Sequence, residues 1–490
     1  MGVVSPQGYG EKMLSDIIYR GRTLRIAIGL TVLVFLMTGG AGATKFINDN
    51  ATGGECTSFG TWDAATKTCT MTADLIETIQ IDSNGTTLDG DGYQTAGNNN
   101  GNGLYLSGRS GVTIKNLNVG QFYNGIYLLN SNNNYLMDNT VSSNNNGIFL
   151  SGSSSNMLSR NNANTNSYYG INLESSSSNT LSSNNANSNS YYGIHLKDSD
   201  NNTLSGNNAN MQKQFNGIYL QSSKINNITG NNANLNNGNG IRLESFSSSN
   251  RLSSNNANSN KDNGIYMYHY SSSNRLSSNN VNSNNGNGIY VSVYSDSNRL
   301  SGNNVSSNKK GGIRLETNSN IASGNNVNSN SVNGIYLSGS SNNVYDNSFN
   351  NTVNFVIDTG GNTWNTDKTS GTNIIGGPYL GGNFWANPSG TGFSQTCTDA
   401  DKDGICDSQY ALDSNNIDFL PLTTLVTAEV KGDLNSNGQS ADAGDLLLMK
   451  RASIGDIQAD SSYDLNNNGE FADAGDLLLM KRASIGEIDL

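Results

Sequence analysis

The sequence is poor in charge, in proline and in hydrophobic residues. Of its 490 residues, 13% are charged, 34% are hydrophobic and 4 are prolines, whereas glycine alone contributes 56. Taken alone, this composition suggests a disordered chain, because little apolar surface is available to offset the entropy lost on folding. The apolar residues nevertheless recur at a fixed period, which predicts an ordered structure for the region that contains them.

An excess of basic charge is also missing. From Asp399 to the C-terminus there are 18 acidic and 6 basic residues, so this segment carries the whole net charge of -12 and the preceding residues are neutral overall. A protein that binds nucleic acid electrostatically needs a basic face. We therefore expect no nucleic-acid partner.

Cysteine is scarce, with four residues in two local pairs: Cys56 with Cys69, and Cys397 with Cys406. Both pairs lie outside the periodic region, and we predict that they form disulfides in an oxidising compartment. A zinc site of four cysteines does not fit, because the pairs lie over 300 residues apart and lack C-x-x-C spacing.

Hydrophobic runs are short, and the clearest one lies near the N-terminus. Arg20, Arg22 and Arg25 precede a run of twelve residues, 26–37, and the small residues 41–43 follow as a cleavage site. We interpret residues 1–43 as a signal peptide and expect a secreted or cell-surface protein, with membrane contact only through this segment. An uncleaved anchor is the alternative, although the run is short for a membrane span.

The periodic region repeats one phrase: a glycine, an aliphatic residue, a variable residue and a second aliphatic residue. Alternation of this kind predicts a β-strand with one buried side. A period of 22 to 24 residues is typical of a solenoid in which each repeat packs on its neighbours. The phrase restarts at Gly103, Gly125, Gly147, Gly170, Gly193, Gly217, Gly240, Gly264, Gly288, Gly312 and Gly334.

Two further short strands are predicted in each coil. One contains Thr180-Leu181 and its equivalents, and the other contains an Ala or Val after an Asn pair, such as Ala186 and Val281. Three strands per coil predict a parallel β-helix, and the many Gly, Ser and Asn residues exclude a helical solenoid. We expect Asn at the turns, where it tolerates left-handed geometry and stacked amides can hydrogen-bond between coils.

Three segments carry a resemblance to a known family. The sequences at 114–119 (IKNLNV), 124–128 (NGIYL) and 202–208 (NTLSGNN) resemble right-handed β-helix repeats of the NosD-type family, which is pectate-lyase-like and includes many archaeal cell-surface proteins. The resemblance covers residues 75–350 and implies the right-handed coiling.

After residue 350 the period is lost and an acidic loop appears. Carboxylates alternate before Gly404, and oxygen ligands in this pattern are typical of a calcium loop. An acidic surface turn held by the Cys397–Cys406 bridge is the alternative. The predicted calcium site comprises Asp399, Asp401, Asp403, Ile405 and Asp407.

The C-terminal segment contains a duplication. Residues 441–455 recur unchanged at 472–486, and each copy follows an Asp/Asn-rich loop with calcium-loop spacing. The duplication resembles a type I dockerin, which implies calcium as the cofactor and a cohesin domain as the partner. The implied ligands are Asp433, Asn435, Asn437, Gln439, Asp442 and Asp445 in the first loop, and Asp464, Asn466, Asn468, Glu470, Asp473 and Asp476 in the second.

Both loops depart from the usual spacing, because the last carboxylate (Asp445 or Asp476) is the thirteenth residue instead of the twelfth. This leaves the ligating role of Asp442 and Asp473 open. The basic residues of the following helices lie near helix C-termini, where positive charge also stabilises the helix dipole. The expected cohesin contacts are Leu447, Lys450, Arg451, Leu478, Lys481 and Arg482.

The variable position of the repeated phrase forms a column that is rich in aromatic residues. Flat rings match the faces of sugars, so we predict glycan binding there; a ladder of rings that stabilises a parallel sheet is the alternative. The candidates are Tyr105, Tyr127, Phe149, Tyr219, Tyr266, Tyr290 and Tyr336.

Catalytic candidates are few. Glycosidases need two carboxylates about 5–9.5 Å apart, whereas Glu174 and Glu244 on this face lie three coils, or roughly 14 Å, apart. The best local cluster is Glu174, His195 and Lys197 on adjacent coils, where a Glu174–Lys197 ion pair explains the cluster without a reaction. With two histidines, the sequence poorly supports the copper site that the NosD name suggests. Arg251, Arg275 and Arg299 form a short basic column, either a solvated edge or an anion track.

The predicted fold class is all-β: a right-handed parallel β-helix solenoid with capped ends, plus a small α-helical calcium-loop domain. Its parts are the signal peptide (1–43), the N-terminal cap and first coils (44–101), the repeats (102–350), the C-terminal cap (351–426) and the dockerin-like module (427–490). We predict a secreted cell-surface protein with a glycan-related binding or structural surface, attached through its dockerin to cohesin-bearing partners. The alternative is a polysaccharide lyase or glycoside hydrolase of a cohesin–dockerin assembly, which the fold supports only by association.

Overall fold

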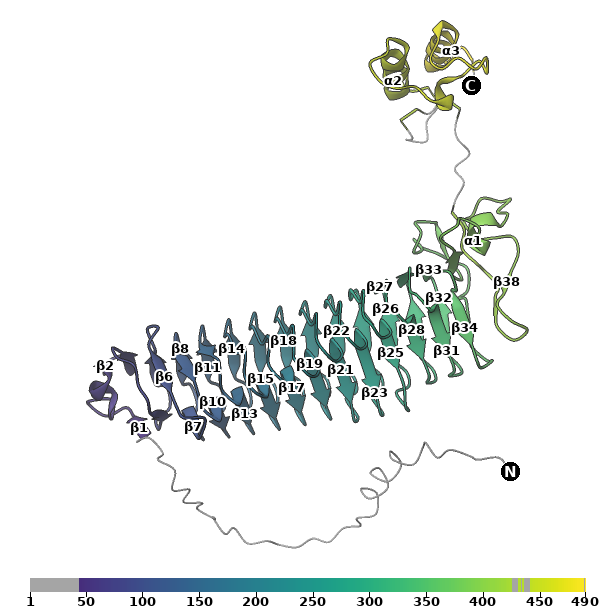
Figure 1. Ribbon diagram of the computed structural model, residues 1–490. Helices are drawn as coiled ribbons and strands as arrows, with labels where there is room; N and C mark the ends of the chain where they lie inside the picture. Colours follow the sequence, from purple (N-terminus) through teal and green to yellow (C-terminus); the bar gives the residue numbers. More distant parts are fainter. Residues whose placement is uncertain (1–43, 425–430, 433, 436–440, 489) are drawn as a thin grey trace, which may run out of the picture. The chain divides into compact units, whose positions relative to one another are not determined.

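The computed structural model describes residues 44–424, 431–432, 434–435, 441–488 and 490. Residues 44–424 contain a parallel β-solenoid, and a separate pair of helices lies near the C-terminus (Figure 1). This confirms the predicted fold class. The predicted signal peptide (1–43) and the loop residues Asp433, Asn437 and Gln439 lie outside the described residues.

Sheet A is formed by the repeated phrase, one strand from each coil. Its strands pair in parallel and in register, so that Ile126 lies opposite Ile148 and Leu128 opposite Leu150. In order, they are β1 (Thr44–Ile47), β4 (Thr78–Ile81), β7 (Asn102–Ser107), β10 (Asn124–Leu129), β13 (Asn146–Ser151), β15 (Tyr169–Glu174), β17 (Tyr192–Lys197), β19 (Ile218–Gln221), β21 (Ile241–Glu244), β23 (Ile265–Tyr268), β25 (Ile289–Val291), β28 (Gly311–Leu315), β31 (Asn333–Leu337) and β34 (Phe355–Ile357).

Sheet B is formed by the second predicted strand of each coil. It consists of β2 (Gly60–Asp63), β3 (Thr68–Met71), β5 (Thr87–Asp89), β8 (Thr113–Lys115), β11 (Tyr135–Met137), β14 (Met157–Ser159), β16 (Thr180–Ser182), β18 (Thr203–Ser205), β20 (Asn227–Thr229), β22 (Arg251–Ser253), β24 (Arg275–Ser277), β26 (Arg299–Ser301), β29 (Ile321–Ser323) and β32 (Asn343–Tyr345).

The third side is less regular than predicted. Strands form only near its two ends: β6 (Gln94–Ala96), β9 (Asn118–Gly120) and β12 (Thr140–Val141), then β27 (Asn304–Ser306), β30 (Asn326–Asn328), β33 (Ser348–Asn350) and β37 (Phe384–Ala386). Between them, coils are joined by single bridges such as Asn185↔Asn208. Most of these middle coils carry alanine, for example Ala186 and Ala209, where four of the seven strands carry valine, and alanine has the weaker β-propensity.

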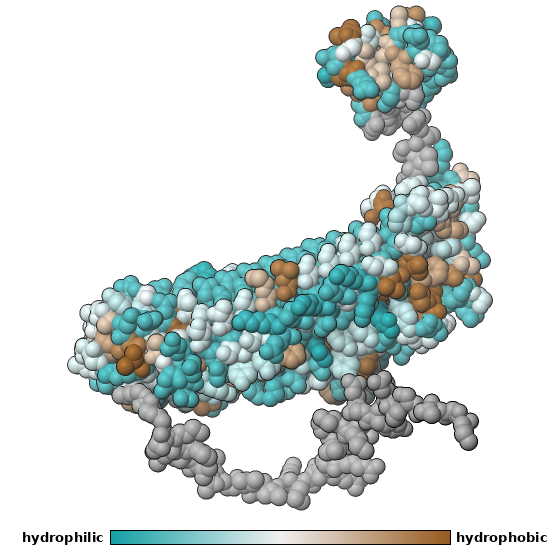
Figure 2. Space-filling view, viewed as in Figure 1, coloured by the Kyte–Doolittle hydropathy of each residue, from teal (hydrophilic) through white to brown (hydrophobic). Residues whose placement is uncertain are grey.

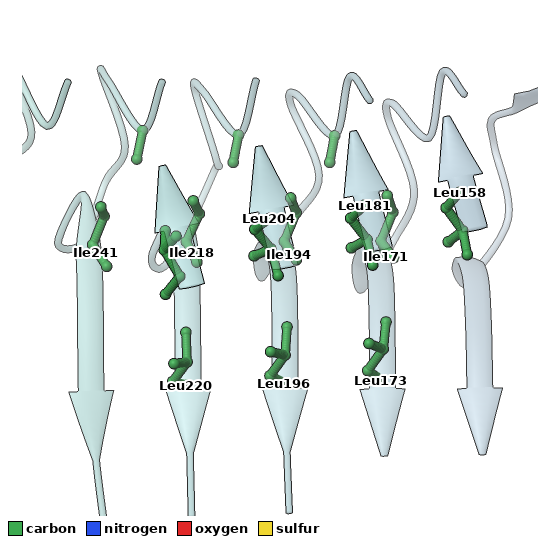
Figure 3. Packing of buried hydrophobic residues seen from close by; sticks show 14 of the residues in the cluster. Leu158, Ile171, Leu173, Leu181, Ile194, Leu196, Leu204, Ile218, Leu220 and Ile241 are labelled. Carbon is green, nitrogen blue, oxygen red and sulfur yellow. The ribbon is translucent and has the colours of Figure 1, made fainter. Parts of the chain in front are cut away.

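The core consists of aliphatic rows along the solenoid. Ile171, Ile194 and Ile218 form one row, and leucines of sheets A and B form others (Figure 3). Each fully buried Leu or Ile contributes about 1.5–3 kcal/mol. The glycine that starts each phrase is required because the next coil lies too close for a side chain: a Cβ at Gly264 would be 2.2 Å from Val281 Cγ1.

Buried asparagines form ladders beside these rows. Asn231, for example, donates from its backbone N and its Nδ2 to Asn255 Oδ1 in the next coil (2.9 and 3.0 Å). We expected Asn also at left-handed turn positions, but serine occupies many of them, as at Ser183 and Ser188 (φ 55° and 58°). The serine bends the chain, and the following Asn184 or Asn189 is buried, where its Nδ2 donates to the backbone carbonyl of Leu158 or Ala163.

Both ends of the solenoid are capped. At the first end, Cys56 of the 3₁₀ turn η1 (Cys56–Ser58) is bonded to Cys69 of β3, and β2 pairs antiparallel with β3. The other end contains helix α1 (Phe393–Thr396), the hairpins β35 (Thr369–Ser370) with β36 (Tyr379–Leu380) and β38 (Tyr410–Ala411) with β39 (Ile417–Asp418), and the Cys397–Cys406 disulfide. Both predicted disulfides are thus confirmed.

A buried carboxylate joins the C-terminal cap to the last coil. Asp418 Oδ2 accepts hydrogen bonds from Trp385 Nε1 and the Asn383 backbone N, both at 2.8 Å. Burial raises the pKa of Asp418 to about 7, while these hydrogen bonds act in the opposite direction. Sequence periodicity carried no sign of this contact, because it joins segments that lie outside the repeats.

The C-terminal module has its own small core. Helices α2 (Ala443–Ser453) and α3 (Ala474–Ser484) have identical sequences and bury Met449 and Met480 with Tyr463 of the 3₁₀ turn η2 (Ser461–Tyr463). Among the described residues, no helix is both long and apolar enough to cross a membrane.

Candidate functional sites

The predicted aromatic column lies along sheet A. Register pairs link Tyr105, Tyr127 and Phe149, whose rings stack with centroids 5.6 and 5.0 Å apart. Further along, Tyr266 and Tyr290 stack at 4.8 Å. Most of the solenoid surface on the face shown in Figure 2 is hydrophilic.

The middle of the column is covered, contrary to the expectation of a uniformly outward row. Asn172, His195 and Tyr219 are only 6%, 5% and 7% exposed. Rings from the first residues of β15 and β17 lie against them: Tyr169 and Tyr192 each lie 5.3 Å from the His195 ring. These strands therefore carry a local concentration of rings, which column alignment alone did not indicate.

Five aromatic residues outside the variable column form this concentration of rings, which we call the aromatic cluster, and the column alignment does not include them. Stacked, tilted and edge-on contacts with centroids 5.2 to 6.4 Å apart connect its rings. The available signal was the phrase Ser-Tyr-Tyr-Gly, which occurs at 167–170 and again at 190–193. The cluster comprises Tyr168, Tyr169, Tyr191, Tyr192 and Phe215.

Several charged groups on the same face are neutralised by neighbours. Lys197 Nζ lies 2.6 Å from Glu174 Oε1, which raises the pKa of Lys197. Glu244 Oε2 accepts from Arg242 at 2.8 Å and from the Tyr219 hydroxyl at 2.8 Å. Arg242 also lies 5.4 Å from the ring of Tyr266, within the range of a cation–π contact.

The same arrangement is repeated further along the solenoid. Glu316 accepts from Arg314 Nε at 2.8 Å and from the Tyr290 hydroxyl at 2.7 Å. Arg314 lies over the Tyr336 ring at 4.1 Å. Burial, together with Glu316, raises the pKa of Tyr290 to about 12, so this hydroxyl stays protonated at neutral pH.

The weak catalytic candidates Glu174, His195 and Lys197 do come together on β15 and β17. The His195 imidazole is neutral, because burial and then Lys197 lower its pKa to about 4, and its Nδ1 lies 2.9 Å from Asn172 Oδ1. The nearest other carboxylate of this column, Glu244, is three register steps from Glu174, or roughly 14 Å at strand spacing. That separation is too long for the two carboxylates of a glycosidase.

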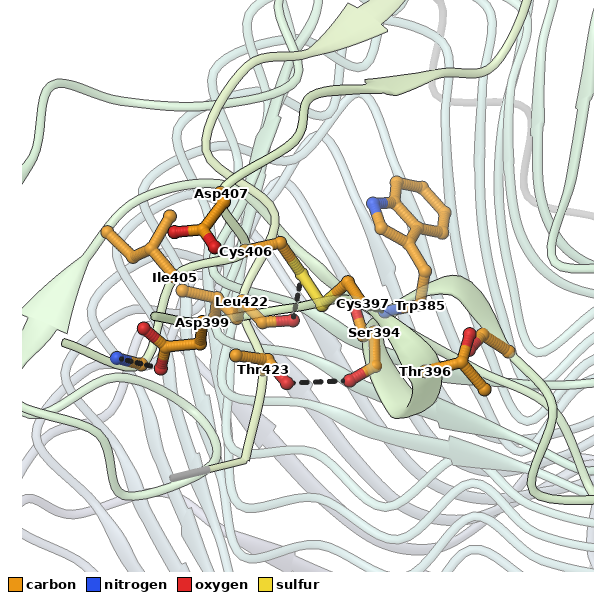
Figure 4. Close-up of a disulfide and its surroundings, with 12 residues drawn as sticks. Trp385, Ser394, Thr396, Cys397, Asp399, Ile405, Cys406, Asp407, Leu422 and Thr423 are labelled. Atoms are coloured by element: carbon orange, nitrogen blue, oxygen red, sulfur yellow. Dashed lines mark hydrogen bonds between the residues drawn. A yellow bond between two sulfur atoms is a disulfide. The ribbon is translucent and has the colours of Figure 1, made fainter. Parts of the chain in front are cut away.

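The acidic loop of the C-terminal cap is closed by its first carboxylate. Asp399 Oδ1 and Oδ2 accept the backbone N–H groups of Asp403 (3.1 Å) and Gly404 (2.9 Å). Gly404 has a φ of 85°, which favours glycine at this sharp turn. The disulfide and Asp407 lie beside the loop (Figure 4), and Asp407 Oδ2 accepts from Ala400 N.

Three carboxylates of this loop converge. Ligand oxygens of Asp399, Asp401 and Asp403 all lie within 4.8 Å of one another. Partial desolvation and the neighbouring Asp403 carboxylate raise the pKa of Asp401, and Lys368 forms an ion pair with Asp403. A divalent cation would relieve this repulsion by replacing the lysine as the counter-charge.

The second loop of the C-terminal module closes in the same way. Asp464 accepts the N–H groups of Asn468 (3.0 Å) and Gly469 (2.8 Å), the residues that correspond to Asp403 and Gly404. Asn466 Nδ2 and Asn468 Nδ2 both donate to Asp473. These side chains therefore already face one another around the loop.

The last two carboxylates of each predicted calcium loop have a structural role that their spacing in the sequence did not indicate. Asp473 is the N-cap of α3, accepting from Gly475 N and Asp476 N, and the buried Asp476 accepts from Asp473 N. Asp442 and Asp445 do the same for α2. Helix capping thus explains these residues without a metal, and their ligating role stays a prediction.

The predicted cohesin contacts fall into two groups. Leu447 and Leu478 are 58% and 57% exposed at equivalent positions of the two helices. Lys450 and Lys481 are also exposed. Arg451 and Arg482, by contrast, form ion pairs with Asp456 (2.6 Å) and Glu487 (3.2 Å) in the turns after their own helices.

The fold and these loops define a class: a parallel β-solenoid protein with acidic loops that follow or cap its coils. The family model described as "Periplasmic copper-binding protein (NosD)" matches residues 67–256, 197–280 and 246–390. These matches cover more than half of the chain, which therefore belongs to this family.

Solved structures with similar folds were also found. The periplasmic alginate epimerase AlgG is 14% identical, with 64% of this chain and 84% of that chain covered and a TM-score of 0.41. The Azotobacter vinelandii mannuronan C-5 epimerase AlgE4 A-module is 16% identical, with coverage of 58% and 90% and a TM-score of 0.42. The Dettilon tailspike protein is 13% identical, with coverage of 65% and 70% and a TM-score of 0.40. No curated protein matches the sequence.

The family description raises the question of copper, and the donors do not fit it. Copper sites in proteins use imidazole, thiolate and thioether ligands. His195 is enclosed by rings on β17, whereas His269 lies in the turn after β23, and all four cysteines form disulfides. Among the described residues, only Asp399, Asp401 and Asp403 form a group of three or more converging acidic, His or Cys ligands. We derive no copper chemistry for this chain.

Proposed function

We propose that this chain is a non-catalytic surface protein whose solenoid binds glycans through the aromatic column of sheet A. The observation that carries the proposal is the two runs of stacked rings on one sheet, Tyr105 to Phe149 and Tyr266 to Tyr290, with the charged groups between them paired. Rings of this kind offer flat apolar surfaces to sugars, and paired charges such as Arg242–Glu244 leave the face neutral. Neutral glycans are therefore the preferred ligands of this face.

Binding is favoured over catalysis because the candidate catalytic side chains are already held in ion pairs and hydrogen bonds. The Glu174 carboxylate is held by Lys197, and the Tyr219 hydroxyl donates to Glu244. A polysaccharide lyase or glycoside hydrolase is the competing function, since Glu174, His195 and Lys197 lie together on two adjacent strands.

A glycan array followed by calorimetry tests this proposal. Replacing both Tyr266 and Tyr290 with alanine should weaken binding of the best glycan at least about tenfold, as expected from losing two aromatic contacts. Tyr135→Ala, which removes an exposed tyrosine from β11 on sheet B, is the matched control and should leave affinity unchanged. Equal losses in both variants would contradict the proposal.

The same polysaccharides should be assayed for product formation. Turnover by the wild-type chain that disappears in Glu174→Gln and Lys197→Gln would establish the enzymatic alternative instead.

The proposal extends to attachment: the C-terminal module binds calcium and, when loaded, a cohesin domain. Three features support it: the matching closure of the Asp399 and Asp464 loops, the duplicated helices, and the equivalent exposure of Leu447 and Leu478. Two disulfides and the periplasmic description of the family also support a location outside the cytoplasm.

A pull-down with a panel of immobilised cohesins tests the attachment. Capture should require calcium and should be lost in Asp464→Ala, whereas Asp262→Asn, an exposed position on the solenoid, should behave as wild type. Capture that persists in excess chelator, or no capture by any cohesin, would overturn it.

A further inference from the structure

Three successive coils carry an additional residue in the turn between sheets A and B. In preceding coils, a buried serine of this turn donates to the carbonyl two residues back, as Ser176 does to Glu174. In the longer coils, Ser247 and Ser271 donate three residues back, to Glu244 and Tyr268. The additional residue is aromatic each time: Phe246, Tyr270 and Tyr294.

These rings are exposed and their backbones are strained. Phe246, Tyr270 and Tyr294 are 49%, 38% and 63% exposed, and their φ angles are 67°, 61° and 57°. Bulky residues avoid this region, and asparagine or glycine would adopt it at lower cost. The rings stack in series with centroids 5.0 Å apart. Strain at an exposed aromatic row points to a role other than stability.

An arginine follows each ring by five residues in the same coil. Arg251, Arg275 and Arg299 start β22, β24 and β26 and lie in register on the outer face of sheet B. All three are exposed, and among the described residues none of them forms an ion pair, whereas Arg160, Arg242 and Arg314 do. Like charges at adjacent register positions destabilise a sheet, so this column also costs stability.

We propose that these three arginines and three rings form a binding track for a linear anionic polysaccharide with a carboxylate or sulfate on each sugar. Each coil supplies one guanidinium group for the anion and one apolar ring in the turn that precedes it. The arginines lie on sheet B and the rings in the adjoining turn, so the track uses other residues than the aromatic column of sheet A and does not depend on the function proposed above.

Spacing favours a sugar polymer over other anionic chains. Coils repeat at about 4.8 Å, the distance between neighbouring strands, and one pyranose residue has a similar length along a linear chain. In an extended acidic peptide, side chains on one side recur at about 6.7 Å. Phosphates of one DNA strand recur at about 3.4 Å along the helix axis. Neither the peptide spacing nor the DNA spacing places one anion on each coil of the solenoid.

Calorimetry of the full chain at low salt with polygalacturonate, chondroitin sulfate, dextran and single-stranded DNA tests the track. We expect binding of one or both anionic polysaccharides that weakens with salt, and weaker or no binding of dextran through this track. Replacing Arg251, Arg275 and Arg299 with glutamine should reduce affinity about tenfold or more, as expected for three exposed charge pairs. Lys213, Lys224 and Lys261, replaced together with glutamine, form a control with the same change in net charge.

A second variant separates binding from folding. Replacing Phe246, Tyr270 and Tyr294 with asparagine suits the left-handed backbone, so the thermal midpoint should not fall while polysaccharide affinity does. Equal affinities of the arginine variant and the lysine control would overturn the proposal. Tighter binding of DNA than of both polysaccharides would overturn the assigned ligand.

Discussion

At the scale of single residues, buried asparagine side chains make hydrogen bonds between coils of a kind that backbone groups make between strands. Asn284 Nδ2 donates to Ala257 O and Asn308 Oδ1, both at 3.0 Å. Its Oδ1 accepts from Asn260 N (2.9 Å) and Asn260 Nδ2 (3.0 Å). One side chain thus satisfies groups in both neighbouring coils.

Replacing Asn284 with alanine should therefore destabilise the solenoid by about 3 kcal/mol, because buried donors and an acceptor lose their partners. Urea unfolding measures the change. The adjacent Asn285 is exposed, and Asn285→Ala should change stability by less than about 0.5 kcal/mol. A loss of similar size in both variants would contradict the ladder's role.

His195 gives the solenoid a pH dependence of predictable sign. Its pKa falls from 6.5 to about 4 on folding because the ring is buried. Between these pH values the unfolded chain binds a proton that the folded chain excludes, so stability is full above pH 6.5 and is lost as the pH falls. The loss should reach about 3 kcal/mol near pH 4.

Unfolding midpoints measured at pH 7 and pH 4.5 test this dependence. His195→Asn, which places an amide next to Asn172, should reduce the difference between the two pH values, while His269→Asn should retain it. An unchanged difference in His195→Asn would assign the pH dependence to other groups.

At the scale of elements, the helices of the C-terminal module begin at carboxylates that were predicted as metal ligands. In α3 the Asp473 carboxylate accepts two backbone N–H groups at 2.7 and 3.0 Å. A serine can provide the same cap, whereas it cannot replace a charged calcium ligand equally well.

Two substitutions at this position separate the roles. Without calcium, Asp473→Ala should reduce α3 stability by about 1 kcal/mol, and Asp473→Ser by only a few tenths. Hydrogen exchange of the α3 amides measures this difference. If Asp473 also binds calcium, calcium should no longer slow hydrogen exchange of the α3 amides in either variant. If calcium slows this exchange in Asp473→Ser as much as in the wild type, the residue only caps the helix.

At the scale of the whole molecule, each coil contacts only its neighbours, so the solenoid should tolerate changes in whole units. Asn226 and Asn250 occupy equivalent ladder positions, because Asn226 N donates to Asn250 Oδ1. Deletion of residues 226–249 removes one complete coil and leaves Asn250 in the place of Asn226.

This deletion should preserve the β-sheet circular dichroism spectrum and cooperative unfolding. Deletion of residues 226–237 removes half a coil, breaks the register of every ladder and should prevent folding. Equal loss of structure in both variants would show that the coils are not interchangeable.

Much of the fold could be predicted because the solenoid is locally regular. A residue such as Ile171 has its equivalents one period away as neighbours, Ile148 and Ile194, so a one-dimensional pattern contains the register. The disulfides were also predictable, since each joins cysteines fewer than 15 residues apart. The convergence of Asp399, Asp401 and Asp403 was predictable because their spacing is local, and their binding of calcium stays a prediction.

Contacts that do not follow the period could not be predicted in this way. Tyr169 and Tyr192, the first residues of β15 and β17, pack on His195 from within sheet A, and aligning the variable column alone does not reveal these contacts. Asp418 reaches Trp385 across the irregular cap, and Asp473 caps a helix because of its backbone geometry.

The amino-acid sequence by itself therefore determined the parallel solenoid, its register and its two local disulfides, because each depends on neighbours at a fixed or short separation. Only the tertiary structure decided which side chains are covered, which charges are paired and which remain open. Those properties depend on three-dimensional packing between coils, as the buried His195 and the exposed Arg275 illustrate.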